Sequence, residues 1–190
     1  MSTFEFVTIL LSVVVGLGFT RLLSGLGRAI EMRGQLKFYW VQMIWSINVG
    51  FYLVMFWWTV VFGYSALESW SFINFTSLLI YAILLYLQAV LIIPSKLEPG
   101  MDLEAHFFSI RKWFFTIGVL LPLIELQDSL MHGFDNLLRL GFLYILMQAS
   151  AIVSAVIARR TNNKIFHGII CLVYLISMVS WVLTQFWSIG

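Results

Sequence analysis

Charged residues are scarce in this chain, and their scarcity excludes most classes of soluble protein. Only 11% of the 190 residues are charged, 61% are hydrophobic, and the mean hydropathy is +0.95. Soluble domains are about 25% charged and about 45–50% apolar. A soluble fold of this length cannot bury so much apolar surface, so we expect its solvent to be a lipid bilayer. Disordered chains and soluble nucleic-acid-binding proteins are excluded, and no nucleic-acid partner is expected.

Cysteine is almost absent as well. Cys171 is the only one and lies inside an apolar run, so the sequence predicts neither an intrachain disulfide nor a cysteine-based metal site. Short motifs of common chemistry are also missing, since the chain has no P-loop, no HExxH and no G-x-S-x-G. We therefore predict no cofactor, and enzymatic activity is the least favoured of three functional hypotheses.

Long hydrophobic runs are what the sequence has in abundance. Six runs are each near or above 18 residues long, which is typical of membrane-spanning helices. They are continuously apolar, whereas strands of membrane barrels alternate. We predict an all-α polytopic membrane bundle, a single integral membrane domain over residues 1–190, with spans at about 4–23, 38–62, 72–93, 107–130, 137–158 and 165–187.

Two details refine this picture. Asp102 precedes the fourth span and is predicted to cap its helix through the amide of Ala105. The spans also fall into two groups of three, separated by the linker at residues 94–106. An odd number of spans in each group would make the groups inverted repeats, as in many transporters.

Basic residues lie almost entirely on one side of the predicted spans. Of the 11 Lys and Arg residues, nine flank one face, Arg139 alone flanks the other, and Arg21 lies deeper in the first span. Cytoplasmic loops carry an excess of Lys and Arg. The basic face is therefore predicted to be cytoplasmic, which places both termini on the outer, periplasmic face of the inner cell membrane.

The strongest candidate for chemistry is a polar cluster at the outer end of the fourth span. Glu125, Asp128 and His132 are spaced i, i+3, i+7, so they share one helical face. Carboxylate and imidazole groups could hold a divalent cation, for which these three are weak candidates, or transfer protons. The alternative is a solvated helix end at the headgroups. Three further polar residues are expected near this depth, namely Glu5, Asp135 and Arg139.

Other polar residues lie deeper in the spans. Asn48 and Gln148 are near the middle of the second and fifth spans. An inner group is also expected, consisting of Arg21, Gln42 and Gln88. Buried amides must find partners in a dry bundle. They are predicted to join helices, and the alternative is that they line a polar pathway. Arg21 either extends to the inner headgroups or lines such a pathway.

Small residues form stripes on two spans. In the first span they recur at i, i+4 spacing, at Ser12, Gly16, Thr20 and Ser24. The fifth span has a shorter stripe, formed by Ser150 and Ser154. Such stripes let helix backbones approach closely. We predict packing within the bundle, with a homo-oligomer seam or a membrane-protein partner as the alternative.

Two main functional hypotheses come from different classes, and a third is less favoured. The first is a small channel or transporter, with a path between Glu125 and Asp128 outside and Arg21 and Gln88 inside. The second is a non-transporting sensor, assembly factor or subunit of a larger membrane complex, which the absence of charge at mid-depth favours over a pump. The third is an intramembrane enzyme that uses the outer polar cluster.

The charge asymmetry makes a direct prediction about orientation. A reporter that is active only in the cytoplasm should be silent when fused after Gly190 and active when inserted at Thr161, because Arg159, Arg160 and Lys164 surround that loop. Reporter activity in cells measures this. The reverse pattern of activity would contradict the predicted orientation.

Overall fold

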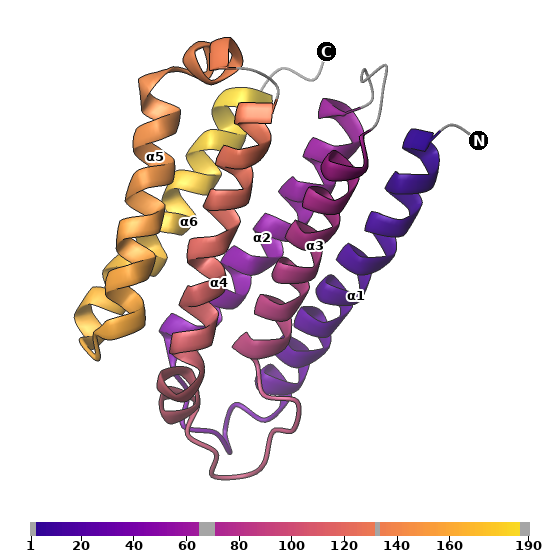
Figure 1. Cartoon of the computed structure of the whole chain (residues 1–190). Helices are drawn as coiled ribbons and strands as arrows, with labels where there is room; N and C mark the ends of the chain where they lie inside the picture. The colour runs from indigo at the N-terminus through magenta and orange to yellow at the C-terminus, as the bar shows by residue number, and fades with distance from the viewer. Residues whose placement is uncertain (1–2, 65–70, 132–133, 187–190) are drawn as a thin grey trace.

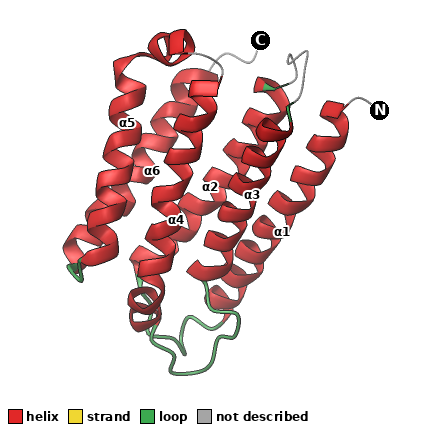
Figure 2. Cartoon of the chain, viewed as in Figure 1, coloured by secondary structure: helices red, strands yellow, loops and turns green. Residues whose placement is uncertain are grey.

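The computed structural model describes residues 3–64, 71–131 and 134–186, with no side-chain description at residues 3, 134–140 and 184–186. It consists of helices (Figures 1 and 2), and the described residues hold no β-strand. The helices are α1 Thr3–Glu31, α2 Trp40–Gly63, α3 Phe72–Ile92, α4 Leu103–Met131, α5 Phe134–Arg160 and α6 Lys164–Phe186. All six contain segments long and apolar enough to cross a membrane. The predicted all-α bundle with six spans is confirmed.

The helices form two layers. One layer holds α1, α3, α4 and α5 in that order, and the other holds α2 and α6 (Figure 1). In this arrangement α2 packs against α1, α3 and α6. Both chain ends lie at one end of the bundle, here called the terminal end. The opposite end carries the connections at residues 32–39, 93–102 and 161–163 and is called the basic end.

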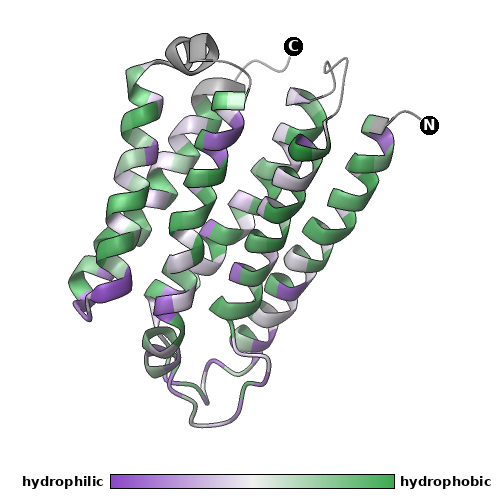
Figure 3. Ribbon diagram, viewed as in Figure 1, coloured by the Kyte–Doolittle hydropathy of each residue, from purple (hydrophilic) through white to green (hydrophobic). Residues whose placement is uncertain are grey.

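Apolar side chains cover the outside of the bundle. Leu17, Phe142 and Ile176 are each more than half exposed, and hydrophobic residues dominate the length of the helices while hydrophilic ones gather at the basic end (Figure 3). A water-soluble monomer does not expose contiguous apolar surface of this extent. The chain is therefore a multi-pass membrane protein whose outer surface contacts lipid.

Two connections are paired at the basic end, and they set where α2 and α4 begin. The Lys37 amide donates to the Met101 carbonyl at 2.9 Å, and the Leu103 amide donates to the Lys37 carbonyl at 3.1 Å. The chain is consequently extended at Tyr39, and α2 starts at Trp40, slightly later than the predicted start of the second span at residue 38.

Asp102 caps α4, as the sequence predicted. Its Oδ1 accepts a hydrogen bond from the Ala105 amide at 3.0 Å, and its carboxylate lies 3.8 Å from the Lys37 ammonium. The hydrogen bond from the backbone and the nearby Lys37 charge hold the pKa of Asp102 below its ordinary value. The cap starts α4 at Leu103, one turn before the predicted fourth span.

A break in α5 falls inside the predicted fifth span. Gly141 has φ 84° and ψ 166°, which is not helical, and it divides α5 into two parts. The spanning part is Gly141–Arg160. The part before it lies at the terminal end, at an angle to the rest of α5 (Figure 1). Glycine readily adopts positive φ, which explains the interruption of the helix there, and the predicted span start at residue 137 stays a prediction.

The predicted packing of the α1 stripe within the bundle is wrong for three of its four residues. Gly16, Thr20 and Ser24 are exposed, and an added Cβ at Gly16 would meet nothing within 4 Å. The buried face of α1 instead carries Leu11, Val15, Gly18, Leu22 and Gly25. A helix buries the face that matches its neighbours' larger apolar side chains, so the stripe points away from α2 and α3.

Two of the remaining stripe residues, Ser12 and Ser154, make contacts with another helix within the described residues, whereas Ser150 does not. Ser12 accepts a hydrogen bond from the Trp57 indole N–H at 2.9 Å, which joins α1 to α2. Ser154 lies 3.0 Å from the Tyr174 hydroxyl of α6. Ser150 is exposed and donates to the Met147 carbonyl of its own helix. The two stripes thus contribute single interhelical contacts rather than a continuous packing face within the chain.

The two groups of three helices pack differently. α1 packs along α3, and a true inverted repeat would place α4 along α6 in the same way. Instead α6 packs mainly against α2 and meets α4 near the basic end, where Lys164 and Glu104 are 2.5 Å apart and Phe107 contacts His167. Helix packing therefore lends no support to the inverted repeat, which stays a prediction from spacing.

The glycines of α1 give a matched test of this packing. A Cβ at Gly25 would lie 2.9 Å from Ile93 Cγ2, whereas Gly16 has open space. Gly25→Leu should lower the free energy of unfolding by about 1–3 kcal/mol, the usual cost of overpacking. Gly16→Leu should not destabilise the monomer. Unfolding in detergent measures both; equal destabilisation by the two variants would contradict the assigned faces of α1.

Candidate functional site: a polar cavity between the layers

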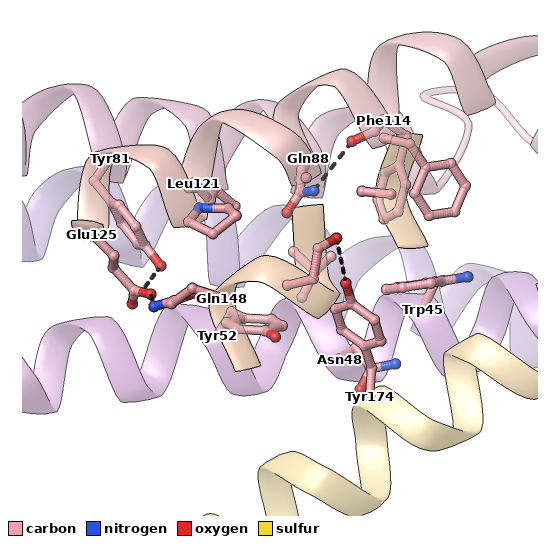
Figure 4. A pocket seen from close by; sticks show the side chains of 16 residues that line it. Trp45, Asn48, Tyr52, Tyr81, Gln88, Phe114, Leu121, Glu125, Gln148 and Tyr174 are labelled. Carbon is pink, nitrogen blue, oxygen red and sulfur yellow. Dashed lines mark hydrogen bonds between the residues drawn. The ribbon is translucent and has the colours of Figure 1, made fainter. Parts of the chain in front are cut away.

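A cavity of about 70 Å³ lies between the two layers of the bundle. Five helices line it, and α1 contributes nothing. Its polar and aromatic lining is drawn in Figure 4, and its members include Trp45, Asn48, Tyr52, Tyr81, Gln88, Phe114, Phe115, Glu125, Gln148 and Tyr174. A water molecule occupies about 30 Å³ in the liquid, so the space suits two waters or a very small solute.

Glu125 is the acidic residue that lines this cavity. Its Oε1 accepts a hydrogen bond from the Tyr81 hydroxyl at 3.2 Å, and its Oε2 accepts a short one from the Gln148 amide. Tyr81 and Gln148 are buried, while Glu125 remains accessible at the surface of the bundle. The carboxylate thus sits where the cavity meets the exterior, held by neutral donors from α3 and α5.

Three amides around the cavity are oriented by their partners. Asn48 Nδ2 donates to the Cys171 carbonyl at 3.0 Å, and Gln88 Nε2 donates to the Phe114 carbonyl at 3.3 Å. Gln148 donates to Glu125. Carbonyls and carboxylates only accept hydrogen bonds, so the group that faces each of these partners must be the NH₂ group of the amide. The contacts join α2 to α6, α3 to α4 and α5 to α4, as expected for amides that connect helices.

Pro122 adds a backbone acceptor to the same wall. It lies inside α4, is buried, and lines the cavity together with Gly118. Proline has no amide hydrogen, so the carbonyl of the residue four positions earlier loses its helical donor. That residue is Gly118, which has no side chain of its own. The Gly118 carbonyl is consequently an acceptor beside the cavity.

The outer polar cluster is divided among different neighbours. Asp128 Oδ2 accepts a short hydrogen bond from the Tyr64 hydroxyl at the end of α2, whereas Glu125 faces the cavity. Within the part of the chain that the structure describes, no three His, Cys, Asp or Glu residues could hold a metal ion. His132 and the side chains of Asp135 and Arg139 lie outside the described residues. Metal binding by Glu125, Asp128 and His132 stays a prediction.

Glu5 belongs to a different part of the surface. It lines a groove on α1 together with Phe4, Thr8 and Ser12. Among the described residues, α1 does not pack against α4, the helix that carries Glu125. The two carboxylates expected at a similar depth are therefore on helices separated by α3.

Arg21 and Gln42, expected as inner polar residues, both satisfy the end of α3. The Arg21 guanidinium donates to the Ile93 carbonyl at 3.2 Å, and Gln42 Nε2 donates to the Ile92 carbonyl at 2.6 Å. The last carbonyls of a helix have no partner within it, and Pro94 follows directly. Arg21 and Gln42 close this helix end, and neither lines the cavity.

Sequence reasoning missed the tyrosines of the cavity. Tyr52, Tyr81 and Tyr174 come from α2, α3 and α6. Each lies in a run rich in aromatic residues, so no spacing rule separates the one that binds Glu125 from the others. The sequence signals at this wall of the cavity were Glu125 itself and Pro122, three residues before it.

The fold and this cavity define an all-α membrane bundle with a small polar cavity among its spanning helices. No family model, no curated protein and no solved structure matches the chain.

The contact between Glu125 and Gln148 predicts an energetic coupling. Gln148→Leu removes one donor from the carboxylate and should cost about 1.5–3 kcal/mol, the usual range for hydrogen bonds to charged groups. In a Glu125→Leu background the same change should cost clearly less, because the charge is gone. Unfolding of the four proteins in detergent measures the difference. Gln127→Leu, which removes a contact with Ser77, is the control and should be additive; additivity at Gln148 would contradict the coupling.

Proposed function

We propose that the protein is a small channel or transporter, and that the cavity between the two layers of helices is its solute-binding site. The observation that carries this proposal is the position of the cavity. Spanning helices rarely place a carboxylate and several amides together unless they face a pathway or a partner. Here Glu125, Gln148, Gln88 and Asn48 surround space large enough for a very small solute.

The accessibility of Glu125 supports a route into the cavity. Glu125 lies six residues before Met131, the end of α4, or about 9 Å at 1.5 Å per residue. Its side chain is exposed while its partners Tyr81 and Gln148 are buried. The proposed route therefore enters near Glu125 and continues past Gln88 toward the basic end.

The packing at the basic end supports a closed state on that side. Gln42, His106, Arg21 and the end of α3 are joined by hydrogen bonds. Alternating access in transporters moves one group of helices against another around a fixed site. In this proposal, the contacts of Arg21 and Gln42 with α3 separate when the cavity opens to the other face.

One observation favours the second candidate, a non-transporting subunit of a membrane complex. The exposed stripe Gly16, Thr20 and Ser24 on α1 leaves open space where another helix could approach. A homo-oligomer or another membrane protein would fill that space. The two candidates are compatible only if the assembly leaves the cavity accessible.

We further propose that the protein lies in the inner cell membrane with both termini on the outer face. The division of basic residues, nine to one, supports this orientation. The proposed entrance beside Glu125 then faces the outside of the cell.

Blocking the cavity tests the proposed transport. The protein reconstituted in liposomes should speed the entry of small solutes after an osmotic shift, as light scattering measures. Gly118→Leu should return the rate to that of protein-free vesicles, since it adds about four carbon atoms to a space for about two waters. A Cβ at Gly118 meets Ala155 and Gln88 only at 3.7 Å, so the first carbon of the new side chain is accommodated without a clash.

Gly16→Leu is the matched control, because it makes the same change on the open face of α1. It should leave solute entry unchanged. Equal rates for Gly118→Leu and the native protein would reject the cavity as the pathway. No entry of any small solute with the native protein would favour the non-transporting subunit.

A further inference from the structure

We propose that the cavity selects a small organic monocation with N–H donors, of the size of methylammonium. This inference rests on the proposed function, because it names the class of solute that the site would bind. It follows from three properties of the cavity, namely its unused hydrogen-bonding capacity, its aromatic walls and its volume.

The unused hydrogen-bonding capacity consists mainly of acceptors. The NH₂ groups of Asn48, Gln88 and Gln148 already donate to carbonyl or carboxylate oxygens. The oxygen of each amide therefore points away from that partner. Asn48 is fully buried, and its Oδ1 has no hydrogen-bond partner within the described residues. The Gly118 carbonyl, freed by Pro122, is a further acceptor. A ligand that matches these groups must donate hydrogen bonds.

Most donors of the cavity are engaged elsewhere, and among the described residues the hydroxyl of Tyr52 is an exception. The Tyr81 hydroxyl donates to Glu125, and the Tyr174 hydroxyl donates to the Ala151 carbonyl at 3.2 Å. The Trp45 indole N–H lacks a partner among the described residues, and Figure 4 shows it pointing away from Glu125. An anionic ligand would therefore find few free donors, and it would also meet the charge of Glu125.

The charge of the cavity is not neutralised by a basic side chain. None of the lining residues is Lys, Arg or His. Acidic residues within spanning helices usually pair with another charge or face a water-filled cavity. The missing positive charge is the feature that a cationic ligand would supply.

The walls favour an organic cation over a metal ion. Six aromatic residues line the cavity: Trp45, Tyr52, Tyr81, Phe114, Phe115 and Tyr174. Aromatic faces attract ammonium groups through their quadrupole. Hard metal cations require about six to eight oxygen ligands, which this mostly apolar lining does not provide. An ammonium group has three donors, and Glu125, Gly118 and the amide oxygens are suitable acceptors.

The volume limits the size of the ligand. The cavity of about 70 Å³ holds about two non-hydrogen atoms at the density of a liquid. Methylammonium has this size, whereas tetramethylammonium is larger and has no N–H donor. For two non-hydrogen atoms at the ceiling of ligand efficiency, the expected Kd is on the order of 5–10 mM.

Thermal unfolding of the full chain in detergent tests this inference. Methylammonium chloride at about 100 mM should raise the Tm by about 3–6 °C relative to sodium chloride at the same concentration. Methanol, a neutral molecule of the same size, and tetramethylammonium should not raise it. A Tm that is equal in methylammonium and sodium would overturn the inference.

Two variants locate the binding. Glu125→Gln keeps the shape of the side chain and removes its charge, so the methylammonium shift should be lost. Glu31→Gln makes the same change at an exposed position near the end of α1 and should keep the shift. If Glu125→Gln does not fold, Gly118→Leu fills the cavity and should also remove the shift. A shift that persists in Glu125→Gln or in Gly118→Leu would overturn the inference.

The outcome separates this inference from the proposed transport. Uptake of labelled methylammonium and entry of neutral solutes are measured on the same liposomes. Stabilisation by methylammonium without flux of any solute would support the cation site and reject transport. Flux of neutral solutes that Gly118→Leu blocks, without stabilisation by methylammonium, would support transport and overturn the cation site.

Discussion

Hydrogen bonds between helices are the constraint on which the rest of this structure depends. A spanning helix satisfies its own backbone, but its polar side chains and its last carbonyls must find partners elsewhere in the protein. The amides do this in the described bundle: Gln42 reaches α3, Asn48 reaches α6 and Gln88 reaches α4. The Asn48 contact joins α2 to α6, which are distant in sequence, whereas the other two contacts hold consecutive helices together.

The same constraint creates the cavity. Gln148 and Tyr81 reach Glu125 from two helices on either side of α4, and Pro122 and Gly118 remove an amide and a side chain from the wall between them. The space beside them is lined by these polar groups and by aromatic side chains. A small polar cavity beside an accessible carboxylate is the basis for the proposed binding of a solute.

The basic end illustrates how the helix ends are stabilised without burying charge. The connection before α2 pairs with the connection before α4, and Asp102 caps α4 while it faces Lys37. Arg21 and Gln42 close the end of α3. These contacts place charged groups near the expected headgroup region, where water and lipid phosphates can reach them, and they leave the interior of the bundle with neutral amides and tyrosines.

The sequence by itself determined the helices and their approximate ends, because hydrophobic length and capping are local properties. Six runs predicted six helices, and Asp102 marked the start of α4. Only the tertiary structure decided which groups meet. Tyr81 and Gln148 are 44 and 23 residues from Glu125, and nothing local identifies them as its partners. The exposed face of α1 was also decided there, because burial of Gly18 and Gly25 rather than Gly16 depends on the shapes of Leu53 and Ile93.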